Sequence, residues 1–497
     1  MPSIRKTKTS SGATAIQVVR YENRKVVMMK HLGSAKTDEE IAALVQDAEI
    51  WLTRETAQSS LFSPVPNRTL RLASCRYVGV RYTFAHTILS AIIHRLGLTG
   101  LNNQLLTDFA LIRVLEPASK LRSIWLMEQY FGIKHAKRSI YRLLPKILEF
   151  KPLIEKLAVA FVQEKISDDL SFVLYDVTTL YFESFEADDL RQPGFSKDNK
   201  ANQPQIVVGL LVNRQGFPLG FEVFQGNTFE GKTMLPVLEA FRSAHNSATC
   251  TVVADAAMMG IKNIEELNER GLNYIVGARA ASLSPVVIEK AATSLGQIDG
   301  ATVRFETDHG DLICSFSAKR WRKDKVEMDK QIAKAKRFVD KQESGRRAKF
   351  VKNDKRKTAY VLNEALVEKT AKLLGIKGYY TNIKETKLTD KEIIAHYHDL
   401  WHVEQSFRMA KSDLATRPIF HYKKDAVKAH LVICFAALMI GKYLEIKTEL
   451  SLRNITDVLK SVTNARIINT TTNEEFNLPS EVGSEAKNLL KKLGLSY

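Results

Sequence analysis

The spacing of hydrophobic residues changes along the chain, and each change predicts a different kind of structure. Residues 13–30 alternate between apolar and polar on both sides of a turn at 22–24, which predicts a β-hairpin, and a helical pattern starts at Thr37. From about residue 80 to residue 165, apolar residues recur every three or four positions, as in consecutive amphipathic helices. We therefore expect a small N-terminal module followed by a helical region.

From residue 171 the hydrophobic period becomes two, which is typical of β-strands. The pattern predicts three strands, then a helix, a strand, a helix that stops at Gly271, and another strand. The expected ranges are 171–182, 205–213, 217–225, 233–245, 251–256, 263–271 and 274–278. This order of elements predicts a mixed sheet flanked by helices.

Residues from about 280 to 378 interrupt this order. They hold short alternating strands at 301–306 and 312–318, and a very basic stretch at 318–358 with 17 lysines and arginines against 6 acidic residues. Such a run is often only a solvated segment, but its position beside the predicted sheet favours a surface that contacts phosphates. A strand at 378–383 and one long helix at 389–413, which begins with a capping box, follow.

Composition narrows the class of protein. A length of 497 residues corresponds to roughly three domains of about 150 residues, and 45% hydrophobic with 26% charged residues is ordinary for a soluble protein. The net charge of +18 favours a polyanionic partner, either nucleic acid or an acidic membrane. The apolar run at 431–441 is too short to cross about 30 Å of hydrocarbon, so we expect a core helix there and no membrane partner.

Other sequence features favour a cytoplasmic, DNA-binding protein. The four cysteines lack the spacing of a zinc site or a disulfide framework, which fits a reducing cytoplasm, and residues 1–11 do not resemble a secretory signal. Residues 137–142 could form a recognition helix whose cations contact phosphates and whose Tyr141 contacts a base. The alternative is a solvated helix face, and both interpretations remain open.

Two aspartates lie on strands that are otherwise apolar, Asp176 within 172–177 and Asp255 near the end of 251–256. A buried ionised carboxylate is costly unless it is paired or binds a cation. Each aspartate alone could form an ion pair or cap a helix, but two of them on strands that can be neighbours suggest a shared site. Glu404 would add a third carboxylate. The predicted long helix places five residues along one face, namely Tyr397, Trp401, Glu404, Arg408 and Lys411.

Three carboxylates suit Mg²⁺ or Mn²⁺, whose preferred ligands are hard oxygens, and do not suit zinc. Two such ions about 4 Å apart can activate a water or a 3′-hydroxyl and stabilise the leaving oxygen in a phosphoryl displacement. The predicted chemistry is therefore the cleavage and joining of phosphodiesters. His398 and His402 also share a helix face, so a zinc pair there is a weaker alternative.

Taken together, these residues resemble the DDE transposases of bacterial insertion sequences, specifically the group with a Y-x2-R-x3-E-x6-K signature. The tyrosine, glutamate and lysine of that signature fall on Tyr397, Glu404 and Lys411, while Leu400 stands at the arginine position and Arg408 could substitute for it. Further similar stretches, covering most of 170–445, are at 175–178, 253–255, 277–279 and 417–421.

The resemblance implies a ribonuclease H-like core interrupted by a β-rich basic insertion, with Asp176, Asp255 and Glu404 as the metal-binding catalytic triad. It also implies that Tyr397 and Lys411 contact the transposon end, although core packing of Tyr397 is an alternative. In related transposases an aromatic residue of the insertion stacks on a flipped base. Trp321 is the candidate here, flanked by Lys319, Arg320 and Arg322 as DNA contacts, and an interface tryptophan is the other interpretation.

We therefore expect a cytoplasmic bacterial transposase, associated with the nucleoid, that binds double-stranded DNA at the transposon ends and the target and acts as a homodimer with two metal ions per site. The alternatives are a catalytically inactive DNA-binding protein and a stand-alone nuclease of the same fold. The expected domains are a hairpin and helix module at 1–60, a helical DNA-binding region at 61–168, the core at 169–279 and 379–445, the insertion at 280–378, and a helical tail at 446–497.

Overall fold

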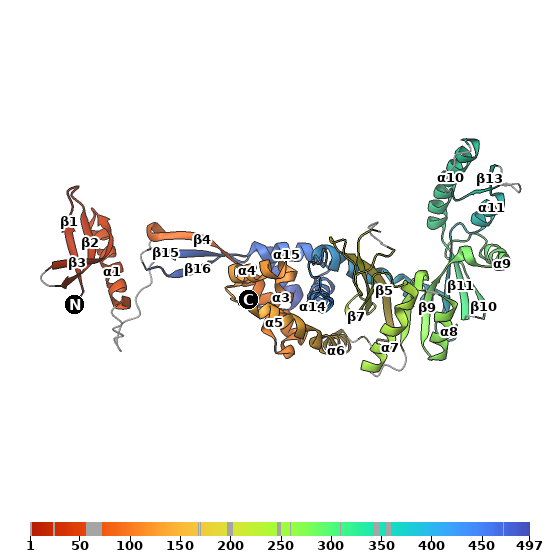
Figure 1. The fold of residues 1–497 in the computed structure, drawn as a ribbon, viewed down its shortest axis with the longest axis horizontal. Coiled ribbons are helices and arrows are strands. Elements are labelled where there is room, and N and C mark those ends of the chain that lie inside the picture. Colours follow the sequence, from red (N-terminus) through yellow and green to blue (C-terminus); the bar gives the residue numbers. More distant parts are fainter. Residues whose placement is uncertain are drawn as a thin grey trace.

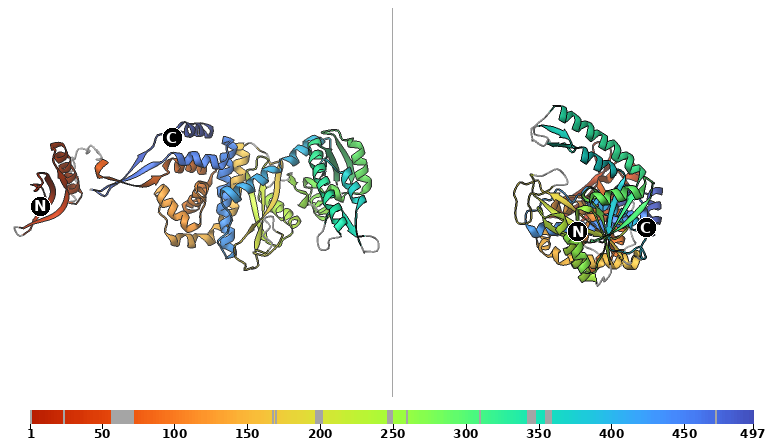
Figure 2. Two further views of the ribbon diagram at one scale, coloured as in Figure 1. Left: turned by 90° about the horizontal axis from the view of Figure 1, so that it is seen from above. Right: turned by 90° about the vertical axis from the view of Figure 1, so that its right-hand side faces the viewer.

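The computed structural model shows an elongated molecule (Figures 1 and 2). It describes residues 2–22, 25–55, 72–166, 168, 170–195, 202–245, 250–258, 260–308, 310–341, 348–353, 359–470 and 472–497. Most of the turn predicted at 22–24 and parts of the predicted basic stretch, at 342–347 and 354–358, lie outside the described residues.

The N-terminal module has its own small core. Its elements are the antiparallel strands β1 (Ser3–Lys8), β2 (Thr14–Glu22) and β3 (Lys25–Ala35) and the helix α1 (Asp38–Glu55). Ile16 and Val18 of β2 pack against Leu44 and Ala48 of α1. Figure 1 shows this module, in red, at one end of the molecule and separate from the rest. The predicted hairpin and helix are confirmed, and β1 is an additional strand.

The next region is helical, as its apolar spacing predicts. Its helices are α2 (Thr83–Arg95), α3 (Gln104–Leu115), α4 (Lys120–Phe131), α5 (Lys137–Ile147) and α6 (Lys151–Phe161). Almost every residue of α3 is buried, because α2, α4 and the later helix α14 all pack against it. The predicted recognition segment lies on α5, where the Tyr141 side chain is 66% exposed.

The core sheet begins with five strands, β5 (Phe172–Tyr181), β6 (Gln205–Val212), β7 (Pro218–Gln225), β8 (Thr251–Ala254) and β9 (Asn273–Ala278). Their order in the sheet is β7-β6-β5-β8-β9, with β5, β6 and β7 antiparallel and β8 and β9 parallel to β5. The connecting helices are α7 (Met234–His245) and α8 (Ile261–Glu269). This strand order is that of a ribonuclease H-like fold, so the predicted fold class is confirmed.

The segment between β9 and the late helices lengthens this same sheet. Strand β14 (Ile376–Thr381) pairs with β9, β11 (Gly310–Phe316) with β14, and β10 (Thr302–Thr307) with β11, all antiparallel. The segment is also rich in helix. Its other elements are α9 (Pro285–Leu295), α10 (Ala318–Lys341), β12 (Val351–Asn353), β13 (Tyr360–Leu362) and α11 (Glu364–Lys372). Figure 1 shows α10 extending from this end of the molecule.

Three helices follow the sheet, α12 (Asp390–His398), α13 (Trp401–Arg408) and α14 (Lys424–Thr448). By length and composition α14 could cross a membrane, but 89% of its most apolar window is buried inside the protein. The apolar sequence of α14 is explained by contacts with the helical region on one side and the sheet on the other. The prediction of a buried core helix is confirmed.

The sequence predicts a helical tail at 446–497, but the C-terminal segment also contains two strands. Helices α15 (Leu452–Ser461) and α16 (Ser484–Leu493) flank strands β15 (Asn464–Asn469) and β16 (Glu475–Pro479). Strand β15 pairs with β16 and, on its other side, with β4 (Cys75–Arg81). The strand β15 that pairs with β4 lies almost 400 residues later in the sequence, and local sequence patterns do not reveal such a partner.

The substitution Gly209→Ala tests the packing of the core sheet. A Cβ on this residue of β6 would lie 2.3 Å from the Tyr175 Oη. We expect Gly209→Ala to destabilise the protein by about 1–3 kcal/mol through overpacking, measured as a lower midpoint of thermal unfolding. The control is Gly100→Ala, where nothing lies within 4 Å of the new Cβ. Equal midpoints for the two variants would contradict this packing.

Candidate active site

The pairing of β5 with β8 places two aspartates beside each other. The strands are parallel, and the last recorded pair is Tyr175 with Ala254, so the next residues along the chain are Asp176 on β5 and Asp255 just beyond the end of β8. Neighbouring strands are about 4.8 Å apart, and residues in register point to the same face of the sheet. The Asp176 side chain is half-buried and that of Asp255 is exposed. Strands β5 and β8 are therefore neighbours, as the sequence analysis considers possible, and the two aspartates follow the last pair between them.

Tyr397 of α12 holds the carboxylate of Asp255 in place. Its hydroxyl donates a hydrogen bond to the Asp255 Oδ1 at 3.0 Å. Burial, and then the negative charges of Asp255 and Glu404, raise the pKa of Tyr397, so this hydroxyl remains a donor. Gly277 on β9 makes room for it, because a Cβ there would lie 2.6 Å from the Tyr397 Oη.

The structure adds Lys377 of β14 to the site. The Lys377 Nζ lies 4.3 Å from the centre of the Tyr397 ring. Burial and then the charge of Arg320 lower the pKa of Lys377, whereas the charges of Asp255 and Glu404 raise it. The sequence analysis missed Lys377, and its only local signal is a lysine within an otherwise apolar strand.

Glu404 lies in the first turn of α13, and its side chain is exposed. The helix packs on β5 and β6, and the Ser406 hydroxyl donates a hydrogen bond to the Gly216 carbonyl oxygen at 2.8 Å in the β6–β7 turn. Gly216 has a φ of +81°, and a Cβ there would lie 3.0 Å from the His402 carbonyl oxygen. This close turn sets the position of α13 over the sheet.

The predicted single helix at 389–413 is interrupted. Its N-terminal capping box, formed by Thr389 and Glu392, is present, but α12 ends at His398 and α13 starts at Trp401. Hydrogen bonds between residues three apart close the tight turn between them, and Arg214 of the β6–β7 turn donates to Asp399 at 3.2 Å. A wider π-helical turn follows at Met409–Asp413.

Because of this interruption, the five residues predicted along one helix face do not share it. Tyr397 is only 6% exposed, whereas Trp401 is 52% exposed, and Glu404 and Arg408 are also exposed. Tyr397 therefore packs in the core, which is the alternative interpretation given in the sequence analysis. Its hydroxyl donates a hydrogen bond to Asp255, and its side chain is not available to DNA in this arrangement. Arg408 remains accessible.

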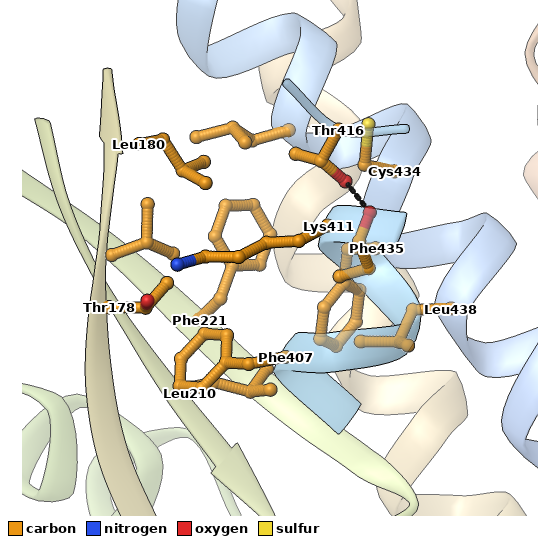
Figure 3. Close-up of a pocket in the computed structure, with 13 residues that line it drawn as sticks. Thr178, Leu180, Leu210, Phe221, Phe407, Lys411, Thr416, Cys434, Phe435 and Leu438 are labelled. Carbon is orange, nitrogen blue, oxygen red and sulfur yellow. Dashed lines mark hydrogen bonds between the residues drawn. The ribbon is translucent and has the colours of Figure 1, made fainter. Parts of the chain in front are cut away.

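Lys411 points into the protein rather than outward. Figure 3 shows its side chain crossing a small cavity toward Thr178 of β5, between α13 and α14. The cavity measures about 50 Å³ and is lined mainly by apolar side chains, among them Phe221, Phe407 and Phe435. Thr178 lies two residues beyond Asp176 on the same strand face, so this ammonium group points toward the strand that carries Asp176.

The predicted DNA contacts of the insertion lie at the start of α10. Lys319, Arg320 and Arg322 are exposed, and Arg320 forms an ion pair with Asp324 at 3.2 Å. Trp321 is half-buried and packs between two small apolar clusters, beside Gly375. That position fits the interface interpretation of Trp321. The charge of Arg320 also lowers the pKa of Lys377.

The donor chemistry fits a divalent cation, but the acids are not gathered around one point. Among the described residues, no group of three or more His, Cys, Asp or Glu side chains could hold a metal ion. Asp176 on β5 and Asp255 just after β8 are hard oxygen donors that follow the last residue pair between two neighbouring strands. The charges of Glu404 and Asp255 both raise the pKa values of Tyr397 and Lys377. The proposed zinc pair has no support, since His402 stacks on Trp401.

A family model described as "Transposase DDE domain" matches residues 168–440, more than half of the chain. A search of curated proteins finds no match. One similar solved structure is a cryo-EM structure of a piggyBac transposase synaptic complex with hairpin DNA. It has 12% sequence identity and a TM-score of 0.37, and the match covers 85% of this chain and 77% of that chain. This structural similarity is too low to support an argument about function.

Tyr397→Phe tests the hydrogen bond that holds Asp255. We expect DNA cleavage, the activity predicted by the sequence, to slow by about tenfold, because a hydrogen bond to a charged group contributes about 1.5–3 kcal/mol. The measurement is the single-turnover cleavage rate. Tyr379→Phe is the control. The ring of Tyr379 packs edge-on against that of Tyr397, with 4.9 Å between the ring centres, but its hydroxyl faces Ser315. Equal rates for both variants would exclude a role of the Tyr397 hydroxyl.

Proposed function

This chain belongs to the family of transposases with a DDE domain, and from that premise we propose that Asp176, Asp255 and Glu404 are its catalytic triad. The observation that carries the proposal is the pairing of β5 with β8, which puts Asp176 and Asp255 at neighbouring positions. DDE transposases use divalent metal ions, and we propose two Mg²⁺ or Mn²⁺ ions held by these carboxylates. Bound there, the ions would activate the attacking hydroxyl and stabilise the leaving oxygen.

The protein's own residues prepare the site for this chemistry. Tyr397 orients the Asp255 carboxylate through its hydrogen bond. Lys377, which lies beside the Tyr397 ring, brings positive charge to the site and offsets the repulsion between the acids and a DNA phosphate. Glu404 is exposed on a helix at the edge of the site, and we propose that it joins the two aspartates when DNA is bound.

The DNA substrates are proposed to be the terminal inverted repeats of the element that encodes the protein, and then a target site. An element of the bacterial insertion-sequence group with the Y-x2-R-x3-E-x6-K signature fits Tyr397, Glu404 and Lys411, with Arg408 in place of the missing arginine. A homodimer in the bacterial cytoplasm would hold two ends together. The Lys411 contact would require DNA to approach the cavity of Figure 3.

Removal of the carboxylates tests the triad. We expect Asp176→Asn, Asp255→Asn and Glu404→Gln each to abolish Mg²⁺-dependent nicking of a duplex that carries the terminal repeats. Binding of that duplex should stay within about tenfold, because cations supply most of the affinity. Chelation of the metal should abolish nicking by the unmodified protein in the same way.

The matched control is Glu269→Gln, an exposed acid at the end of α8, which should cleave normally. Retained cleavage in any triad variant would contradict the assignment. A pre-cut end with a free 3′-hydroxyl separates the alternatives. Strand-transfer products indicate a transposase, whereas hydrolysis alone would indicate a nuclease and binding alone an inactive DNA-binding protein.

Charge removal on α10 tests the insertion as a DNA contact. Lys319, Arg322 and Lys323 are exposed in its first two turns. We expect their joint replacement by glutamine to reduce the slope of log affinity against log salt by up to about three, since each phosphate contact contributes about 0.9. Replacement of the exposed Lys262, Lys290 and Lys487 is the control. An unchanged slope in the α10 variant would show that this helix face does not bind DNA.

A further inference from the structure

A second site lies where the helical region meets the core. A cavity of about 440 Å³ is enclosed by α3, the start of α4, α5 and the chain from residue 415 to residue 430. Its walls include Arg113, Lys120, Arg417, His421 and His430. Among the described residues that line the cavity there is no aspartate or glutamate. The site is therefore built for a negatively charged or electron-rich ligand.

Two of these cations are buried without a carboxylate. Arg113 is 4% exposed and Lys120 is 8% exposed, and neither forms an ion pair with any described acid. Arg113 donates hydrogen bonds to three carbonyl oxygens, those of Leu414 at 2.7 Å, Ala415 at 3.1 Å and Ala118 at 3.1 Å. These bonds orient the guanidinium group but leave its charge in place. Burial of unpaired cations is costly, and an anion in the cavity would offset that cost.

The hydrogen bonds around His430 leave Lys120 free to act as a donor into the cavity. Deep burial, together with Lys120 and Arg113, keeps the pKa of His430 well below its usual value, so the imidazole is neutral. Its Nε2–H donates to the Thr416 carbonyl oxygen at 3.0 Å, and its Nδ1 accepts from the Lys120 Nζ at 2.6 Å. An ammonium group has three donors, so Lys120 retains further donors for a ligand.

The pKa shifts of Lys120 and His421 also indicate that no described acid compensates the positive charge in the cavity. Burial, followed by the charge of Arg113, lowers the pKa of Lys120 to about 7. Burial and these two cations also lower the pKa of His421 to about 4, so this second histidine is neutral too. Arg113 and Arg417 thus supply the permanent charge of the cavity, and Lys120 is only partly protonated near pH 7. A bound anion would keep Lys120 protonated.

The rim of the cavity reaches the surface of the protein. Tyr141 of α5 and Phe420 line the cavity and are 66% and 65% exposed, so both reach the surface. The N-terminus of α4, which Ser119 caps, also borders the cavity and adds partial positive charge. Cations, a helix N-terminus and flanking aromatic rings are the groups that contact a nucleic acid backbone and its bases.

We propose that this cavity binds a phosphate group of the DNA that the protein holds between α5 and the core. The proposal rests on the proposed function for the source of the phosphate, and on the buried cations for the site itself. Arg113 also donates to the carbonyls of Leu414 and Ala415, which follow Lys411 closely in the chain. A phosphate here would link DNA bound by the helical region to the catalytic core.

The first experiment uses inorganic phosphate as the probe and the full chain as the protein. Phosphate, compared with chloride at equal ionic strength, should raise the thermal unfolding midpoint of the unmodified protein. Lys120→Met should abolish this increase and, without phosphate, should be as stable as the unmodified protein or more so, because it removes an unpaired buried charge. Lys120→Arg keeps the charge and should restore the increase.

Lys442→Met is the matched control, since Lys442 is equally buried but is paired with Glu445 at 3.1 Å and lies outside the cavity. It should lose stability and keep the response to phosphate. Equal responses in the Lys120→Met variant and the unmodified protein would overturn the site. A response that Lys120→Met and Lys442→Met lose alike would also overturn it, because it would not be specific to the cavity.

The second experiment identifies the source of the phosphate. Lys120→Met should weaken binding of a terminal-repeat duplex by about tenfold and reduce its salt slope by about one contact, whereas Lys442→Met should leave both unchanged. A phosphate response with unchanged duplex affinity would assign the site to free phosphate and overturn its role in DNA binding. Neither measurement uses cleavage, so a failure of the proposed catalytic function is seen separately in the nicking assay.

Discussion

The parallel register between β5 and β8 is the constraint on which the proposed catalytic site depends. A shift of one residue would send one aspartate to the opposite face of the sheet, because side chains alternate along a strand. The apolar neighbours of Asp176, Val173 to Val177, are buried apart from the acid itself, and β8 is buried throughout. The hydrophobic pattern that stabilises the sheet is therefore the same pattern that brings the two carboxylates together.

Close carboxylates repel each other and repel the phosphates of DNA. Positive charge at the site reduces both repulsions. Lys377 comes from β14, which pairs with β9, and Arg320 from the first turn of α10. Both elements lie in the segment that follows β9 in the chain. This segment is thus more than a basic surface, since it holds Lys377 at a defined place beside Tyr397.

The sequence predicts what local periodicity controls, and fails where distant contacts decide. The strands and helices of the core follow from hydrophobic spacing, and both aspartates stand out because they interrupt apolar strands. The break between α12 and α13 depends on the β6–β7 turn, where Arg214 reaches Asp399, so helix periodicity alone predicts one continuous helix. Lys377 becomes part of the site only through the pairing of β14 with β9, and the inward direction of Lys411 depends on the cavity beneath α14.

The pairing of β4 with β15 also has a consequence for biosynthesis. Strand β4 ends at Arg81 and finds its partner at Asn464–Asn469, and Arg95 of α2 donates to the Gly494 carbonyl oxygen at 2.6 Å. Contacts this distant in sequence slow folding, because a long loop must close before they form. During synthesis on the ribosome, the contacts of β4 and α2 with the C-terminal segment therefore form only after that segment has been made. A prematurely terminated product would leave one edge of β4 without its partner strand.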